Sequence, residues 1–240
     1  MRSLRSGRLL GAVGLISASA LLAGCSSTST ALPTDHVDRE LASQTSAAAQ
    51  AAMDRQVRVS VIGDSFSAGQ DNDVVWPDVL AEEHGIRVAN VSLGGSGYVA
   101  GDDYLGTFAD QVALATEERP SVILVVGSEN DVDADPDDVL TNAEDLYDGL
   151  RRRSPDARIV VIGPIWTGGP VAESMWDVDA AVEAAATSAG LEFVDTLDKG
   201  WLADPTLIQE DGDHPTDEGQ YLLAGHIDDA LVGLDPDLLG

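Results

Sequence analysis

Two short polar motifs in the sequence contain the residue types that acyl transfer at a serine requires. They are Gly63-Asp64-Ser65 and Asp211-Gly212-Asp213-His214. A serine hydroxyl becomes an effective nucleophile only when a base accepts its proton, and histidine is the natural base near neutral pH. Asp211 is three residues from His214, so its carboxylate can reach the imidazole locally and fix its tautomer. Ser65, His214 and Asp211 are therefore candidates for nucleophile, base and orienting acid.

Two further motifs could supply hydrogen-bond donors to such a site. Asn90-Val91-Ser92-Leu93-Gly94-Gly95 offers backbone amides, and Gly127-Ser128-Glu129-Asn130-Asp131 offers the side-chain amide of Asn130. Donors aimed at an oxygen that becomes negative in the transition state stabilise it by about 3–4 kcal/mol each. The four motifs together would make a complete site for hydrolysis of an acyl compound.

An alternating pattern of strands and helices positions these motifs. Near-continuous apolar runs separated by helical stretches are typical of parallel strands that are covered on both faces. The pattern predicts an α/β fold, a three-layer α/β/α sandwich with a five-stranded parallel sheet, of the flavodoxin-like type. The expected strands are 57–62, 86–91, 122–126, 159–162 and 191–194, and the expected helices are 76–84, 103–118, 137–153, 171–189 and 216–232.

The predicted sheet brings the four motifs to one place. Each of the first three motifs directly follows an expected strand, and the Asp211 motif follows the last strand after a loop. In open α/β sheets, ligands bind beyond the carboxyl ends of the strands. We therefore expect all four motifs at one edge of the sheet.

In these four motifs the sequence resembles the SGNH hydrolases, also called the GDSL-type esterase family, over about residues 57–232. Gly63-Asp64-Ser65, Gly95, Asn130 and the Asp211–His214 pair stand where the family has its four blocks. The resemblance implies a serine ester hydrolase, an esterase, lipase or carbohydrate O-deacetylase, that works through an acyl-enzyme without a cofactor.

The resemblance also implies a role for each matched residue. Ser65 would be the nucleophile, His214 the base and Asp211 its orienter. The oxyanion hole would consist of the Ser65 and Gly95 backbone N–H groups and the Asn130 side-chain amide. Ser128 departs from the family's glycine at that position, which leaves the orientation of Asn130 open.

The first 24 residues predict export. Arg2, Arg5 and Arg8 precede an apolar run, followed by Ala23-Gly24-Cys25, which is the organisation of a secretory signal. The ending resembles the lipobox of bacterial lipoproteins, which implies lipidation of Cys25 and anchoring to the outer face of the cell membrane. The alternative is an ordinary signal peptide with an incidental cysteine. The predicted organisation is a signal peptide (1–24), a tether with a possible helix at 36–53 (25–55), and the hydrolase domain (56–240).

The charge and composition of the chain limit the kinds of molecule that it is expected to bind. The chain has 240 residues and a formal charge of −29, and without the three N-terminal arginines it carries ten Lys and Arg against 42 Asp and Glu, a charge of −32. Such a charge argues against nucleic acid and against anionic substrates. With one cysteine, no disulfide within the chain is possible. We expect a monomer that acts on a small-molecule or glycan ester.

Rival interpretations rest on single motifs. Gly63-Asp64-Ser65-Phe66-Ser67 lacks the second glycine of the α/β-hydrolase elbow. Gly95-Ser96-Gly97-Tyr98-Val99-Ala100 matches a loose dinucleotide fingerprint but follows the second strand rather than the first. The acids from Asp133 to Asp137 mimic a calcium loop without its glycine, and a helix capped by Asp135 fits them better. The four histidines are scattered, so we predict no metal site.

Two questions stay open at this stage. Trp166 and Trp176 could wall a substrate pocket or belong to the core. The competing class of function is a non-catalytic envelope lipoprotein that binds a glycan or lipid in the same pocket. A pure binder has no need of Ser65, Asp211 and His214 together, which favours the enzyme.

Overall fold

The computed structural model describes residues 34–101 and 105–240. The alanine-rich stretch near the N-terminus forms helix α1 (Thr34–Arg55). The chain divides into two compact units at residues 48 and 49, and the second unit, Ala49–Gly240, contains the whole sheet. Cys25 and the predicted signal peptide lie outside the described residues.

The sheet has five strands that are all parallel. They are β1 (Arg58–Ile62), β2 (Arg87–Asn90), β3 (Val122–Val126), β4 (Arg158–Ile162) and β5 (Glu192–Val194). Their order across the sheet is β2-β1-β3-β4-β5, which is the flavodoxin-like order. The sequence-based prediction of a five-stranded parallel sheet is confirmed.

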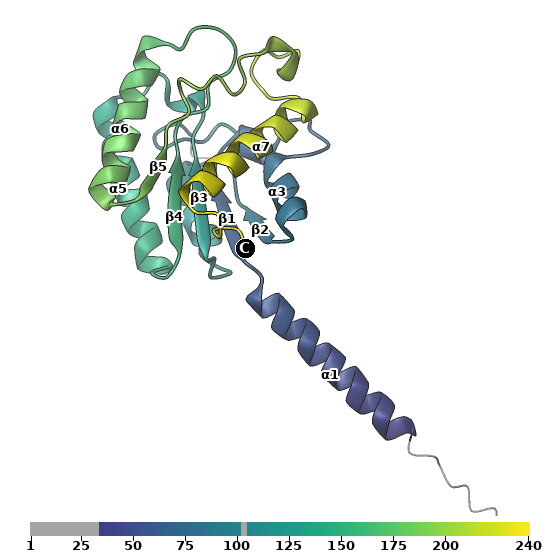
Figure 1. The fold of residues 1–240 in the computed structure, drawn as a ribbon. Helices are drawn as coiled ribbons and strands as arrows, with labels where there is room; N and C mark the ends of the chain where they lie inside the picture. The colour runs from purple at the N-terminus through teal and green to yellow at the C-terminus, as the bar shows by residue number, and fades with distance from the viewer. Residues whose placement is uncertain (1–33, 102–104) are drawn as a thin grey trace, which may run out of the picture. The chain divides into compact units, whose positions relative to one another are not determined.

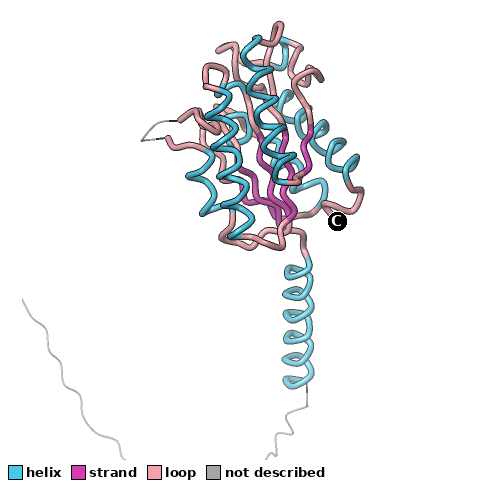
Figure 2. Tube along the Cα trace, turned by 90° about the vertical axis from the view of Figure 1, so that its left-hand side faces the viewer, coloured by secondary structure: helices cyan, strands magenta, loops and turns pink. Residues whose placement is uncertain are grey.

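Helices cover both faces of the sheet, as Figures 1 and 2 show. Helices α3 (Trp76–His84) and α7 (Asp217–Leu234) cover one face, and α4 (Phe108–Ala115), α5 (Pro136–Arg153) and α6 (Glu173–Ala189) cover the other. Side chains alternate between the faces along each strand. In β3, Leu124 packs with α3 and α7, whereas Ile123 and Val125 pack with α4, α5 and α6. The expected three-layer sandwich is therefore the observed fold.

Two helix starts show how local sequence sets the element bounds. Asp135 caps α5 by accepting a hydrogen bond from the Asp137 backbone N–H at 3.0 Å, so the acidic run is a helix start, as preferred above. The helix expected at 103–118 is shorter and begins only at Phe108. Thr107 is its N-cap, and the Asp110 carboxylate accepts from the Thr107 N–H at 2.8 Å, which fixes the start there.

Three short helices were not expected from the sequence. They are α2 (Ser65–Ala68) and the 3₁₀ turns Glu129–Asp131 and Pro205–Leu207. Such elements are too short for a periodic apolar pattern. The first two follow β1 and β3 directly, and each contains a residue of the motifs described above.

Candidate active site

Hydrogen bonds join the first three polar motifs at the carboxyl edge of the sheet. The Leu93 N–H and the Ser96 hydroxyl each donate to the Gly63 carbonyl, both at 3.1 Å. The Asn130 side-chain amide donates to the Ser96 carbonyl at 2.9 Å. The expectation that these motifs meet at one edge follows from the parallel sheet, and the described bonds place them in direct contact.

Ser65 is the first residue of α2, immediately after the turn that follows β1. Asp64 is the N-cap of this helix, and its Oδ1 accepts from the Phe66 N–H at 2.9 Å. Ser65 is therefore not needed as a cap. Its side chain is mostly buried, with 7% of its surface exposed, and its Oγ lies 3.0 Å from His214 Nε2.

His214 and Asp211 form the other half of the arrangement. His214 Nδ1 lies 2.7 Å from Asp211 Oδ2. The backbone N–H groups of Asp213 and His214 donate to Asp211 Oδ1 at 3.0 and 3.1 Å. The Asp213 N–H and the His214 ring lower the pKa of Asp211, so the carboxylate is ionised and can only accept. Nδ1 then carries the proton, and Nε2 is free to accept one from Ser65.

The loop that carries His214 is fixed by side-chain amides. The Gln209 N–H donates to the His214 carbonyl at 2.8 Å. The amides of Gln209 and Asn72 both donate to the Pro215 carbonyl, at 2.8 and 3.0 Å. The Phe66 ring meets the imidazole edge to face, with 6.2 Å between ring centroids. The backbone of this loop and the ring of His214 are thus both held in place by contacts within the protein.

The glycine loop after β2 lies against Ser65. A Cβ atom placed on Gly94 would come 3.7 Å from the Ser65 Cβ. Gly95 has a φ of +74°, a conformation that favours glycine. The loop thus brings the backbone of Gly94 and Gly95 beside the candidate nucleophile.

Asn130 lies in the 3₁₀ turn after β3, and its amide is anchored rather than free to rotate. One of its two N–H groups donates to the Ser96 carbonyl at 2.9 Å. Ser128, the departure from the family pattern, caps this turn with φ of −133°. That conformation is open to any residue, so no glycine is required there.

The two acids beside Asn130 face other partners. The Asp131 carboxylate is buried and accepts from the backbone N–H groups of residues 98, 99 and 100, at 2.7, 2.9 and 2.7 Å. The Glu129 carboxylate accepts from the Thr167 N–H and hydroxyl, at 3.2 and 3.0 Å. Burial raises the pKa of Glu129. Asp131 therefore orders the loop of residues 98–100, and Glu129 binds the loop after β4.

Two buried glutamines that we did not single out from the sequence connect these elements. Gln111 of α4 accepts from the Gly63 N–H at 3.1 Å and donates to the Gly63 carbonyl and the Ser96 Oγ, at 2.8 and 2.9 Å. Gln220 of α7 accepts from the Trp76 N–H at 2.9 Å and donates to the Phe66 carbonyl at 3.0 Å. The sequence signal for such a residue is a glutamine at a core-facing position of an amphipathic helix, because a buried side-chain amide needs hydrogen-bond partners.

His84 and His226 have structural partners, and the two tryptophans considered above differ in burial. His84 Nε2 lies 2.7 Å from Asp228 Oδ1, and His226 stacks on Trp201 with 5.2 Å between centroids. Trp166 packs against the core beside α6, and Trp176 is 44% exposed on α6. No group of three metal-ligating side chains occurs within residues 34–101 and 105–240. Over the same residues, no helix combines the length and apolar character needed to cross a bilayer.

Asp64 gives a prediction about stability and pH. It is fully buried, and burial raises its pKa from 3.8 to about 7, against the opposing effects of the Ser128 hydroxyl and the Phe66 N–H. Between about pH 4 and 7 the folded chain keeps this proton while the unfolded chain loses it. The free energy of unfolding therefore falls as the pH rises through that window.

The substitution Asp64→Asn removes this titration and keeps an oxygen for the cap. In urea denaturation we expect the variant to gain about 1–3 kcal/mol over the wild type between pH 5 and pH 8. Asp204, which caps the turn at residues 205–207 by accepting from the Thr206 N–H at 2.9 Å, is the control. That bond lowers the pKa of Asp204, so this carboxylate is ionised in both the folded and the unfolded chain between pH 5 and pH 8, and Asp204→Asn should differ from the wild type by a constant amount over that range. A constant difference between Asp64→Asn and wild type over this range would contradict the assignment.

Comparison with known proteins identifies the family. The sequence profile of the GDSL-like Lipase/Acylhydrolase family matches residues 61–222. A GDSL lipase of Mycobacterium tuberculosis is 34% identical over 184 residues, which cover 70% of this chain and 79% of the relative. The matched segment contains all four motifs.

Solved structures show the same fold at low sequence identity. A family-two carbohydrate esterase from Cellvibrio japonicus superposes with a TM-score of 0.62 at 16% identity, over 77% of this chain and 63% of that one. The psychrotrophic esterase EstA from Pseudoalteromonas sp. superposes with a TM-score of 0.59 at 15% identity, over 74% and 97%. The profile match and the mycobacterial relative together show that the chain belongs to the GDSL-like lipase/acylhydrolase family.

Proposed function

We propose that the protein hydrolyses carboxylic esters through a covalent intermediate on Ser65. The observation that carries the proposal is the hydrogen-bonded series of Ser65 Oγ, His214 and Asp211, with successive distances of 3.0 and 2.7 Å. Membership of a lipase/acylhydrolase family supports it. A serine, an imidazole and an ionised carboxylate in this order can activate the hydroxyl for acyl transfer.

In the first half of the reaction, Ser65 Oγ attacks the ester carbonyl carbon while His214 Nε2 takes the hydroxyl proton. The carbonyl oxygen becomes negative and would be stabilised by the Ser65 and Gly95 N–H groups and by the second N–H of the Asn130 amide. Asp211 stabilises the imidazolium. Collapse of the intermediate breaks the ester bond, and His214 gives its proton to the departing alcohol.

In the second half, water replaces the alcohol. His214 takes a proton from the water as its oxygen attacks the acyl carbon, and then returns a proton to Ser65 Oγ as the bond to serine breaks. The products are a carboxylic acid, the alcohol from the first half and the unchanged enzyme. No cofactor is needed at any step.

The proposed substrate is an uncharged small-molecule or glycan ester. The two structural neighbours named above are an esterase and a carbohydrate esterase, which supports this range of alcohols. Carboxylates surround the site, since Asp213 lies 3.7 Å from His214 Nδ1 and Glu129 is half-buried nearby in the turn after β3. These charges disfavour anionic substrates near the nucleophile.

A fluorophosphonate probe tests the proposal against a non-catalytic binding protein. Such a probe reacts only with an activated serine, so we expect stoichiometric labelling of the wild type at Ser65. The Ser65→Ala variant should remain unlabelled, and mass spectrometry of the labelled peptide locates the adduct. A folded wild-type protein that takes up no probe would favour the binding-protein alternative.

We also propose that the protein is exported and anchored to the outer face of the cell membrane by a lipid on Cys25. The support is the sequence Leu21-Leu22-Ala23-Gly24-Cys25 after a basic and apolar start. A single acyl chain binds a membrane only marginally, so the proposal requires the multi-chain anchor of a bacterial lipoprotein.

The substitution Cys25→Ser tests the anchor. We expect the variant to lose lipid labelling and to accumulate as an uncleaved precursor or as soluble protein. The measurement is metabolic labelling with a fatty acid followed by fractionation, with Ser26→Ala as the neighbouring control. Unchanged lipid labelling of Cys25→Ser would rule the anchor out.

A further inference from the structure

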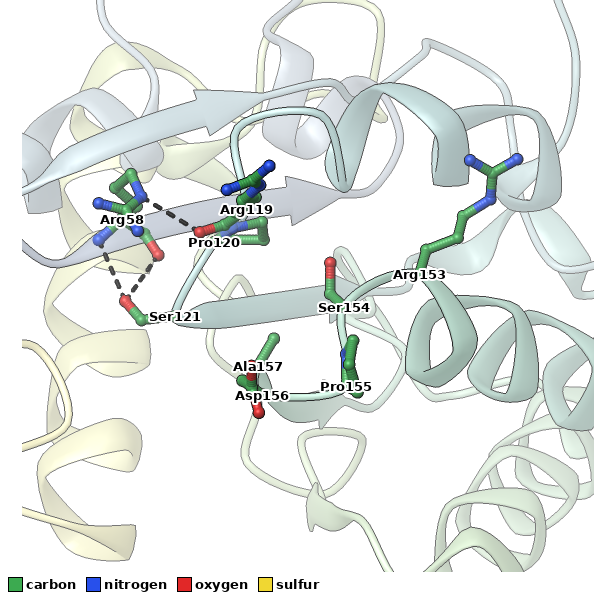
Figure 3. A pocket seen from close by; sticks show the side chains of 9 residues that line it. All are labelled: Arg58, Arg119, Pro120, Ser121, Arg153, Ser154, Pro155, Asp156 and Ala157. Carbon is green, nitrogen blue, oxygen red and sulfur yellow. Dashed lines mark hydrogen bonds between the residues drawn. The ribbon is translucent and has the colours of Figure 1, made fainter.

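A cavity of about 540 Å³ lies at the amino edge of the sheet, at the opposite end of β1 from Ser65. It is formed by the first residue of β1, the connection from α4 to β3, and the end of α5 with the turn into β4 (Figure 3). The side chains that matter here are those of Arg58, Arg119, Arg153 and Ser154. None of them belongs to the site described above.

Three arginines around one cavity are unusual in a chain this acidic. Beyond the predicted signal peptide the sequence has only ten Lys and Arg, against 42 Asp and Glu. Within the part of the chain that the structure describes, none of Arg58, Arg119 and Arg153 forms an ion pair. An acidic protein that leaves three arginines of one cavity lining without carboxylate partners has kept local positive charge there.

Three acids near this edge form ion pairs with other arginines. Arg87, which pairs with Arg58 in the register of β1 and β2, holds Glu118 at 2.9 Å. Arg158, the first residue of β4, holds both Glu192 and Asp235 at 2.5 Å. The other two arginines at the strand starts thus neutralise these three carboxylates, and the cavity lining itself has three arginines against one carboxylate, Asp156.

The backbone around the cavity is held in place. Arg58 Nε donates to the Arg119 carbonyl at 3.1 Å, and the Ser121 hydroxyl donates to the Arg58 carbonyl at 3.0 Å. Arg119 has a φ of +51°, a strained conformation for a residue other than glycine. These bonds join β1 to the segment before β3, so the two arginines keep a fixed separation without a ligand.

Ser154 provides an observation that is independent of the arginines. It is 93% buried, with only 7% of its surface exposed. Over the described residues its hydroxyl has no hydrogen-bond partner, which is unfavourable for a buried hydroxyl. In Figure 3 this hydroxyl points to the space between Arg119 and Arg153. Because this oxygen is itself closed to solvent, a rotation of the Ser154 side chain about its Cα–Cβ bond brings the hydroxyl to a ligand oxygen in the cavity.

We infer that this cavity binds the phosphate group of an organic phosphate ester. Guanidinium groups bind phosphate oxygens through paired, charge-assisted hydrogen bonds, and Ser154 adds a neutral donor. The cavity is far larger than one phosphate and falls in the range of small-molecule sites. Asp156 also lines it, so the organic part would carry a hydroxyl or amino group that donates to this carboxylate. Both a soluble phosphate ester and a phospholipid headgroup have this chemistry.

The test uses the full-length chain with Ser65→Ala, so that no ester probe is consumed and the result does not depend on the proposed hydrolysis. The probes are inorganic phosphate, glycerol phosphate, and vesicles of phosphatidylcholine with and without phosphatidylglycerol. Calorimetry measures the soluble probes and co-sedimentation measures the vesicles. We expect saturable binding of glycerol phosphate, of phosphatidylglycerol vesicles, or of both, and the two arms distinguish the soluble from the lipid source.

Three variants distinguish binding in the cavity from non-specific electrostatic attraction to the protein surface. We expect Arg119→Gln with Arg153→Gln to weaken binding at least tenfold, and Ser154→Ala to weaken it about threefold or more although it changes no charge. The control is Arg151→Gln with Arg152→Gln, which removes the same two charges from exposed neighbours on α5 and should leave binding within twofold. Thermal unfolding checks that each variant is folded, and Ser154→Ala carries the test if the double variant is not.

Two results would overturn the inference. One is the absence of saturable binding of every probe to the parent protein. The other is equal loss in the variant with Arg151→Gln and Arg152→Gln and in the variant with Arg119→Gln and Arg153→Gln, with no effect of Ser154→Ala, which would mean diffuse attraction rather than a built site.

Discussion

Ser65→Ala is expected to lower kcat for hydrolysis of a simple aryl acetate by about 10⁴-fold or more, because it removes the attacking atom. His214→Ala should have a similar effect, and the double variant should be little worse, since the two residues act as a unit. Asp211→Ala should cost less, because this carboxylate orients and stabilises the imidazole without bonding to substrate. Stopped assays with purified variants measure all four.

Ser67→Ala is the matched control for Ser65→Ala. Ser67 is a buried serine of the same short helix, and its hydroxyl accepts from Trp76 Nε1 at 3.1 Å. Its loss should cost about 1 kcal/mol of stability and leave kcat within about threefold. Substantial turnover by a folded Ser65→Ala protein would exclude the serine mechanism.

Asn130→Ala is expected to lower kcat by about 10²–10³-fold with little change in KM, as for a donor that acts mainly in the transition state. The amide has two N–H groups, and only one is used by the Ser96 carbonyl. The anchored group presents its second donor in a fixed direction, which is the condition for a strong effect.

The substitution also removes an anchor of the loop, and Asn142→Ala controls for that loss. The Asn142 amide of α5 donates to the Tyr98 carbonyl at 2.9 Å, so it binds the same loop by the same chemistry. Asn142→Ala should lose similar stability and keep most of its kcat. If Asn130→Ala keeps a kcat within about threefold of wild type, the side-chain donor has been misassigned.

Patterns among residues close together in the sequence predicted the strands and the start of α5. The apolar runs gave the strands because buried parallel strands must be apolar on both faces. Asp135 and Pro136 gave the start of α5 because capping needs only neighbouring residues. The parallel sheet then implied that the residues after the strands share an edge, which is why the motifs could be placed before the structure was seen.

The contacts at the candidate site and the cavity that the sequence did not predict depend on residues far apart in the chain. Gln111 is 48 residues from Gly63, and Gln220 is 154 residues from Phe66, and nothing in a local pattern says which backbone groups a buried amide will satisfy. The orientation of Asn130 depends in the same way on Ser96, 34 residues away. The arginines of the amino-edge cavity come from three separate segments, so only the fold shows that they converge.

Asp211 and His214 lie in one short turn, so forming the hydrogen-bonded series of Ser65, His214 and Asp211 requires only one contact between distant parts of the chain. Base and carboxylate move together, so tertiary structure has only to set the gap between Ser65 Oγ and His214 Nε2, which are 149 residues apart. The same segment continues into α7, whose Gln220 grips the Phe66 carbonyl one residue beyond Ser65. Ser65 and His214 are therefore both held relative to the same helix, α7. Motions elsewhere in the domain can shift the whole assembly while the spacing between Ser65 and His214 is preserved.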